Sequence, residues 1–291
     1  MARAVLQDSL GEVASTPGQD LSAYQEWIEN GWERSLDYYQ STLDQRYADE
    51  RADFLQQQAS MLDHYHAVSP MAREHYPSNL QWEKLPEPAT PEQKTVSQIL
   101  SARRTTLVPA AHSLSMPDLS AILWEGFRKI ASFRVPELQT DHRQAMVNFG
   151  SSLDIYVVVF AISELESGVY RYNVTSHSLG LVAAGDYRGE TQAALVGQPA
   201  PRTAAVTLFY VSDVYRHQWR YRHERALRGL WIDTGKAVNE MLWTLALRNI
   251  SPHISPALGD DVALKLLGLP VGIDRQVIYA VSFAGALPDA S

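Results

Sequence analysis

The residues best suited to chemistry gather at the start of a long helical pattern, between residues 216 and 242. Four arginines crowd this start: Arg220, Arg222, Arg225 and Arg228. Such a cluster repels itself unless an anion lies near it. Tyr221 stands in the positive field of the cluster, which favours the phenolate and predicts a pKa below the ordinary value for tyrosine.

Two interpretations of this stretch stay open. In the first, Tyr221 exchanges a proton with a substrate, while Arg220 lowers the pKa of the phenol or holds an anion. In the second, the arginines form a solvated helix start, and Tyr221 packs against Trp219 with its hydroxyl on a carbonyl oxygen.

A second basic group follows a short predicted helix. The sequence TVSQILSARR, residues 95–104, ends at Arg103 and Arg104, and paired guanidinium groups suit an anion such as phosphate. No glycine-rich phosphate loop and no nucleophile elbow occurs in the sequence. His64 and His66 are two residues apart and cannot share a helix face, so we predict no metal site.

The composition excludes several classes of function. With 33 acidic and 25 basic residues, the net charge of −8 argues against binding to nucleic acid or to an anionic membrane. The absence of cysteine excludes thiolate chemistry and cysteine-ligated metals. The longest apolar run, residues 155–162, is too short to span a bilayer, and the first residues lack the apolar region of a signal peptide. We therefore expect a cytoplasmic protein.

Charge and proline content divide the chain into three predicted segments. Residues 1–90 carry 15 acidic and 6 basic residues, whereas the remainder is nearly neutral. Aromatic and aliphatic residues recur there at three- and four-residue steps, which predicts an acidic helical extension over residues 1–75. A proline-rich passage predicts an extended linker over residues 76–94, and the main domain then occupies residues 95–291.

The main domain, which must position the basic groups, mixes strands with helices. Helices are predicted over residues 116–130 and 260–269. The long helix after the arginines has one apolar face: Leu227, Leu230, Trp231, Thr234, Val238, Met241 and Leu242. Runs of β-branched and aromatic residues predict five strands, over residues 155–162, 168–174, 178–185, 204–214 and 276–283, the second and third forming a hairpin. This mixture predicts an α+β fold with helices flanking a mostly antiparallel sheet.

Four segments of the main domain carry a resemblance to a known family. They are GVYRYNVTSHSLGLVAAGDYRGETQAALVGQ, AAVTLFYVSDVY, WRYRHERALRGLWIDTGKAVNEML and DDVALKLLGL, in this order. From about Leu62 to Ala284 the chain resembles the SagB-type members of the FMN-dependent nitroreductase-like flavoproteins, which are azoline dehydrogenases of ribosomal peptide biosynthesis. The resemblance implies a nitroreductase-like fold, here with a helical N-terminal extension, and a dimer. Trp231 and Trp243 are the expected contacts between the two copies.

The resemblance also implies which residues hold the cofactor FMN. Arg103 and Thr105, with Arg104 between them, match the positions where the family binds the flavin phosphate. The family's second flavin segment falls on the sequence VNFGSS, where the corresponding positions are Asn148, Gly150 and Ser151.

Two further positions follow from the same resemblance. The backbone N–H that faces flavin N5 comes from a segment aligned with HISPAL, at Ser255, Pro256 and Ala257. The family's catalytic Lys–Tyr pair falls on Arg220 and Tyr221.

The sequence departs from the family pattern at several of these positions. Leu107 replaces a further basic residue, only Gly150 matches in the second flavin segment, and Arg220 replaces the lysine. Proline has no N–H, so the donor to flavin N5 is missing if Pro256 occupies that position.

These departures keep two functions open. The leading hypothesis is an FMN-dependent dehydrogenase that oxidises thiazoline or oxazoline rings to thiazoles or oxazoles in ribosomally synthesised peptides. The alternative is a flavin-deficient pseudoenzyme, a structural or substrate-presenting partner of an active dehydrogenase or a cyclodehydratase. A flavin reductase of unrelated small molecules would share the fold. The expected partners are a peptide substrate and a cyclodehydratase or homologous dehydrogenase subunit.

Overall fold

The computed structural model of the chain describes residues 21–43, 79–89, 93–132, 134, 152–220 and 224–286. No helix within these ranges is long and apolar enough to cross a membrane. The chain divides into two compact units, Met1–Gln58 and Ala59–Ser291. The segment boundaries expected from the sequence, at residues 75 and 94, stay a prediction.

The described part of the first unit, residues 21–43, forms two short helices, α2 (Leu21–Glu29) and α3 (Glu33–Ser41), as the helical pattern of these residues predicts. Gly31 separates them with a φ of 77°, a left-handed conformation that favours glycine. Trp27 contacts Trp32 edge-on, with 5.6 Å between the ring centroids. The aromatic spacing therefore closes a small helical hairpin.

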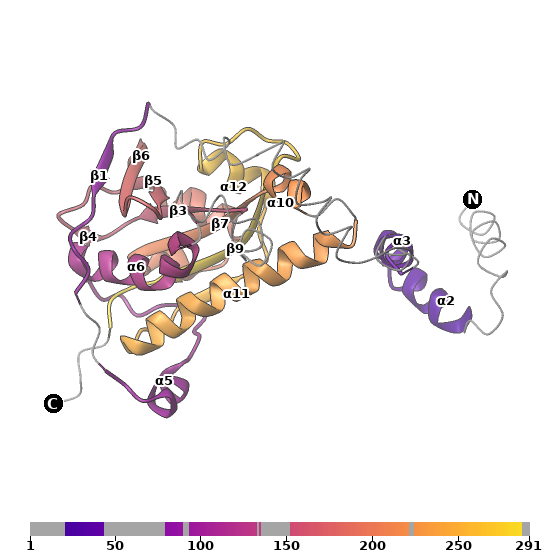
Figure 1. Ribbon diagram of the computed structural model, residues 1–291, viewed down its shortest axis with the longest axis horizontal. Coiled ribbons are helices and arrows are strands. Elements are labelled where there is room, and N and C mark those ends of the chain that lie inside the picture. Colours follow the sequence, from indigo (N-terminus) through magenta and orange to yellow (C-terminus); the bar gives the residue numbers. More distant parts are fainter. Residues whose placement is uncertain are drawn as a thin grey trace, which may run out of the picture. The chain divides into compact units, whose positions relative to one another are not determined.

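The second unit is built around a seven-stranded sheet in the order β1-β6-β5-β3-β7-β9-β8 (Figure 1). Each neighbouring pair in this sheet is antiparallel. The strands are β1 (Trp82–Lys84), β3 (Leu153–Val159), β5 (Gly168–Asn173), β6 (Ser178–Ala184), β7 (Val206–Asp213), β8 (His253–Ser255) and β9 (Arg275–Phe283). A separate parallel pair joins β2 (Leu114–Ser115) to β4 (Ile162–Ser163). The α+β class, the antiparallel sheet and the β5–β6 hairpin are confirmed.

The central strands are apolar on both faces. All residues of β3 and of β7 are buried, as their continuous β-branched and aromatic runs predict. The two strands pair along their whole length, from Leu153–Ser212 to Val159–Val206. Alternate residues therefore project into two separate cores, one on each face of the sheet.

Two long helices, α6 (Met116–Ser132) and α11 (Ala226–Leu247), lie side by side on one face of the sheet (Figure 1). The apolar stripe predicted for α6 is buried in this core: Leu119, Ile122, Leu123 and Phe127. The helices approach closely at Gly126, where an added Cβ would overlap Cε of Met241. A larger residue at Gly126 would therefore require the Met241 side chain to move.

The opposite face is covered by shorter helices. These are α9 (Arg188–Ala194) and α12 (Asp260–Leu266), with a 3-10 turn at Ala200–Arg202. Their apolar side chains, such as Leu195 and Leu264, pack against residues of the central strands. The sequence predicts α12, but α9 is an addition.

Three further elements lead toward the predicted site. The proline-rich segment that is predicted to be a linker contributes β1 to one edge of the sheet. α5 (Val96–Ala102) follows it and packs against α11. α10 (Val214–Arg220) leaves the end of β7 and precedes α11.

The apolar face predicted for α11 is wrong at Trp231, which is 49% exposed. The buried face instead follows residues spaced by three and four positions: Leu230, Thr234, Ala237, Val238, Met241 and Leu245. Each residue of a helix turns the chain by about 100°, so Trp231 lies beyond the edge of the face that Leu230 occupies.

The contact between β1 and β6 generates a prediction. Trp82 lies opposite Gly180, and a Cβ on Gly180 would come within 2.9 Å of the indole ring. Gly180→Ala should therefore displace β1 and destabilise the protein by about 1–3 kcal/mol. Urea unfolding measures this change. Gly189→Ala is the matched control, because a Cβ there meets no atom within 4 Å. Equal stability of Gly180→Ala and wild type would contradict the packing of Trp82 on Gly180.

Candidate functional site

The first predicted cofactor segment follows the end of α5. Thr95 caps the start of this helix in a capping box with Gln98, and Arg103 is its C-terminal cap residue. Arg103, Arg104 and Thr105 are all exposed. No described carboxylate forms an ion pair with either arginine, so both guanidinium groups stay available for an external anion.

The segment predicted to face flavin N5, Ser255–Ala257, begins at the end of the edge strand β8 and is called the N5 loop. The Ser255 hydroxyl accepts a hydrogen bond from the N–H of Ala257 at 3.1 Å and lies 3.2 Å from the Ala257 carbonyl oxygen. Pro256 between them has no N–H. The N–H of Ala257, next to Pro256, is therefore already hydrogen-bonded within the loop.

Hydrogen bonds bring these two segments together. The N–H of Thr106 donates to the carbonyl of Pro252 at 2.9 Å. His253 contacts the carbonyl of Thr106 through Nδ1 at 3.1 Å and Oε1 of Gln198 through Nε2 at 2.6 Å. Gln198 Nε2 in turn donates to the Ser255 hydroxyl at 2.8 Å. The predicted phosphate segment and the predicted N5 loop are thus joined by one chain of contacts.

The remaining predicted residues lie wholly or partly outside the described ranges. Asn148, Gly150 and Ser151 are outside them, as is Tyr221. Arg220 is the last residue of α10, but its side chain is outside the described residues. The roles of these residues stay predictions.

Two contacts hold the start of α10 and connect α10 to α11. At the start of α10, the N–H of Arg216 donates to Oδ1 of Asp213 at 3.0 Å. Between the two helices, Nε2 of the buried His217 lies 2.7 Å from the carbonyl oxygen of Ala226, the first residue of α11. The predicted reactive pair stands between His217 and Ala226 in the sequence, and its own placement stays a prediction.

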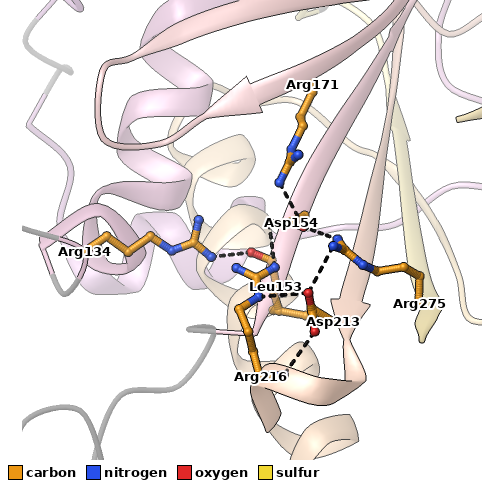
Figure 2. Close-up of polar contacts among 7 residues, drawn as sticks. All are labelled: Arg134, Leu153, Asp154, Arg171, Asp213, Arg216 and Arg275. Atoms are coloured by element: carbon orange, nitrogen blue, oxygen red, sulfur yellow. Dashed lines mark hydrogen bonds and ion pairs between the residues drawn. The ribbon is translucent and has the colours of Figure 1, made fainter. Parts of the chain in front are cut away.

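A buried ionic cluster ties the start of α10 to the sheet (Figure 2). Asp154 on β3 contacts Arg216 Nη2 at 2.7 Å, Arg275 Nη1 at 2.7 Å and Arg171 Nη2 at 3.0 Å. Asp213 contacts the same Arg275 at 3.0 Å. The two carboxylates thereby join helix α10 to four consecutive strands of the sheet, β5, β3, β7 and β9.

Electrostatics decide the charge state of Asp154. Burial by itself would raise the pKa of this carboxyl, but the guanidinium groups of Arg216, Arg171 and Arg134 more than offset burial and hold the pKa well below its usual range. Arg134 also donates to the carbonyl of Leu153 (Figure 2). Asp154 is therefore a structural anion and not a proton donor.

A cavity of about 630 Å³ borders the loop Ser255–Ala257. Its lining comes from the N5 loop, α11, α12 and β9, and includes Pro256, Trp231, Asp260, Asp261 and Tyr279. Burial raises the pKa of the Tyr279 phenol, so its hydroxyl stays protonated at neutral pH. The volume is within the range of small-molecule sites. The cavity lies between the predicted N5 loop and the helix that follows the predicted reactive pair.

Sequence reasoning missed His253, Gln198 and the ionic cluster. Asp154 and Arg171 each stand in a strand of otherwise apolar residues, and a charge in such a run is a signal of buried pairing. His253 and Gln198 are single polar residues without a spacing pattern, so the sequence carries no signal for their contact.

Known structures share this arrangement of sheet and helices. A putative nitroreductase from Anabaena variabilis superposes with a TM-score of 0.62 and 19% identity, over 78% of this chain and 46% of that chain. A second, from Ralstonia eutropha, has a TM-score of 0.54 and 20% identity, over 73% and 92%. The chain has the nitroreductase-like fold. The fold predicted from the sequence is confirmed.

One sequence relative adds to this result. The nitroreductase-like chain is 29% identical over 157 residues to the trifolitoxin operon protein TfxC of Rhizobium leguminosarum bv. trifolii. The match covers 51% of this chain and 44% of that protein, so the chain spans less than half the length of this relative. No family model matches the chain. The fold and this relative fit the predicted resemblance to a divergent SagB-type, nitroreductase-like protein.

The two ends of the predicted site differ in how well their residues fit the FMN that the resemblance implies. The phosphate end fits, because Arg103, Arg104 and Thr105 offer two guanidinium groups and a hydroxyl at the surface. The N5 end lacks the expected amide, because Pro256 has no N–H and the N–H of Ala257 is bonded to Ser255.

The ionic cluster generates a prediction for stability. Asp154→Asn leaves buried arginines without their shared anion and should lower the free energy of unfolding at pH 7 by about 3–5 kcal/mol. The pKa of Asp154 is depressed in the folded state, so its contribution is present above the unfolded pKa of about 4 and is lost as the pH falls further.

Urea unfolding at pH 7 and at acidic pH measures this difference, which should shrink in acid. Asp261→Asn is the control, because this exposed carboxylate forms no ion pair with a described residue. A difference that stays constant with pH would contradict the role of the Asp154 charge.

Proposed function

We propose that the chain is an FMN-dependent dehydrogenase that oxidises thiazoline or oxazoline rings in ribosomally synthesised peptides to thiazoles or oxazoles. One observation supports this proposal above the others. On a nitroreductase-like fold, hydrogen bonds through His253 and Gln198 join Thr106 to the loop Ser255–Ala257. Thr106 directly follows the segment Arg103–Thr105, and both this segment and the loop are expected to bind flavin.

The proposal gives each group a role. Arg103 and Thr105 would hold the phosphate, with Arg104 adding positive charge beside it. Asn148, Gly150 and Ser151 would complete the flavin contacts. When bound, FMN supplies the acceptor for a hydride from the azoline ring, and O₂ takes up the electron pair on reoxidation to give hydrogen peroxide. The cavity beside Pro256 would receive the peptide ring.

The ring must lose a proton as well as a hydride. Tyr221 would accept that proton, because a phenolate near several arginines is less costly than one in water alone. Arg220 would stabilise the phenolate, since arginine itself stays protonated at neutral pH. In the sequence, both residues stand between His217 and Ala226, which contact each other.

A second candidate function has its own observation. Neither Pro256 nor Ala257 offers a free N–H, which favours a flavin-deficient pseudoenzyme that presents substrate to an active partner. The partners proposed for either function are a peptide substrate, a cyclodehydratase or homologous dehydrogenase subunit, and a second copy with Trp231 in the contact. The relative TfxC belongs to an operon for trifolitoxin, which supports a place in peptide modification.

The absorbance of the purified protein separates the two candidates. A dehydrogenase should carry bound flavin, visible in its absorption spectrum and identified as FMN after release by heat. Incubation with an azoline peptide under air should remove two hydrogen atoms from each ring, as measured by mass spectrometry. Colourless protein that gains no flavin on addition of FMN would support the pseudoenzyme.

Binding of the phosphate should depend on Arg103 more than on Arg104. Arg103→Ala removes a charge-assisted contact of about 1.5–3 kcal/mol and should raise the Kd for FMN roughly 10- to 100-fold. Arg104→Ala should have a smaller effect. Arg128→Ala, on the exposed side of α6, controls for the loss of one positive charge. Equal Kd values for Arg103→Ala and wild type would remove Arg103 from the site.

Tyr221→Phe keeps the ring and removes only the hydroxyl, so it separates chemistry from packing. Turnover of an azoline peptide should fall by about 10²-fold or more, while flavin content and Tm stay unchanged. Tyr215→Phe, in α10 and 40% exposed, is the control. Normal turnover by Tyr221→Phe would show that the tyrosine only packs.

A further inference from the structure

His253 connects the segment that ends at Thr106 to Gln198 through its side chain. Its residue is 7% exposed, and its ring nitrogens reach Thr106 on one side and Gln198 on the other. Thr106 contributes a carbonyl oxygen, so Nδ1 of His253 donates the proton in that contact. Between the segments that contain Thr106 and His253, the described backbone adds one bond, from the N–H of Thr106 to Pro252.

Gln198 extends this connection to the N5 loop. It lies beyond α9, on the face of the sheet opposite α11, and reaches across to Ser255 and to the carbonyl of Ala257 at 3.5 Å. Ser255 in turn bonds to the N–H of Ala257. A single side chain therefore contacts both the histidine and the loop that contains Pro256.

We propose that His253 and Gln198 are positioning residues of the flavin site. This inference rests on the proposed function and deepens it. His253 holds the segment Arg103–Thr105 in place for the phosphate, and Gln198 holds the loop Ser255–Ala257 in place for the ring system.

The physical reason lies in the exposure of the phosphate segment. Arg103, Arg104 and Thr105 are at the surface after the last turn of α5, where a free segment would sample many conformations. Side-chain contacts that fix the next residue, Thr106, reduce the entropy lost when a phosphate is bound. The two guanidinium groups are then already in place when the ligand arrives.

The test uses full-length protein freed of bound flavin and two probes, FMN and riboflavin, which lacks the phosphate. Kd values come from the quenching of flavin fluorescence. His253→Ala should raise the Kd for FMN about tenfold and the Kd for riboflavin much less, because only the phosphate contact is disturbed. Gln198→Ala should weaken both probes by a similar factor, because it loosens the loop near the ring.

A double-mutant cycle separates positioning from general stability. In the absence of the Arg103 guanidinium, His253→Ala should have little further effect on FMN binding, since the group that it positions is gone. His253→Asn should retain FMN selectivity, because its amide nitrogen replaces Nδ1, whereas His253→Gln should lose it. These two variants keep the test valid if His253→Ala does not fold. His112→Ala is the control histidine.

The outcomes are distinct. Wild-type protein that binds neither probe overturns both the proposed function and this inference. Wild-type protein that binds FMN, with His253 variants of equal affinity, overturns the inference alone. Effects of His253→Ala and Arg103→Ala that simply add, or equal losses for FMN and riboflavin, also overturn it.

Discussion

The carboxylate of Asp154 is the point on which the arrangement of the second unit depends. It is buried in the sheet and contacts arginines from β5, β9 and α10 (Figure 2). A buried ion pair adds little net stability, because desolvation offsets most of the Coulomb attraction. The ion pairs of Asp154 instead fix geometry, because moving an arginine away would leave buried charge without its partner. The junction between β7 and α10 is therefore set by charge as well as by packing.

This junction connects the ionic cluster to the proposed chemistry. Arg216 is in the first turn of α10, and Arg220 ends the same helix one turn later. His217 joins α10 to the start of α11, so the residues between them begin and end at fixed points. On the proposed function, this network would help to place the reactive pair without a catalytic role of its own. At the other end of the proposed site, His253 and Gln198 connect Thr106 to the loop Ser255–Ala257.

The two ends of the proposed flavin site differ in how well they suit the cofactor. At the phosphate end, a pair of exposed guanidinium groups has no described partner and fits an anion. At the N5 end, a proline and an internally bonded amide replace the expected donor. We therefore expect the choice between the two proposed functions to depend on the residues at the N5 end and not on the fold.

The sequence by itself determined the parts of this protein that depend on local patterns. β3, β7, β9, the β5–β6 hairpin and α6 follow from runs and periods of apolar side chains, because burial of each depends on neighbours a few residues away. The nitroreductase-like fold was instead implied by the resemblance of four segments to a known family, and not by these patterns. α9, α10 and β8 are short and contain few aliphatic residues, so no apolar period marks them, whereas α12 has the same length as α9 and carries such a pattern.

The tertiary structure alone decided which distant groups meet. Asp154 and Arg275 are 121 positions apart, and His253 and Thr106 are 147 apart, so no local spacing marks either pair. The exposure of Trp231 likewise depends on which side of α11 faces the sheet. The packing of whole strands and helices determines which distant charged and hydrogen-bonding groups meet, and no periodic pattern in the sequence indicates these pairs.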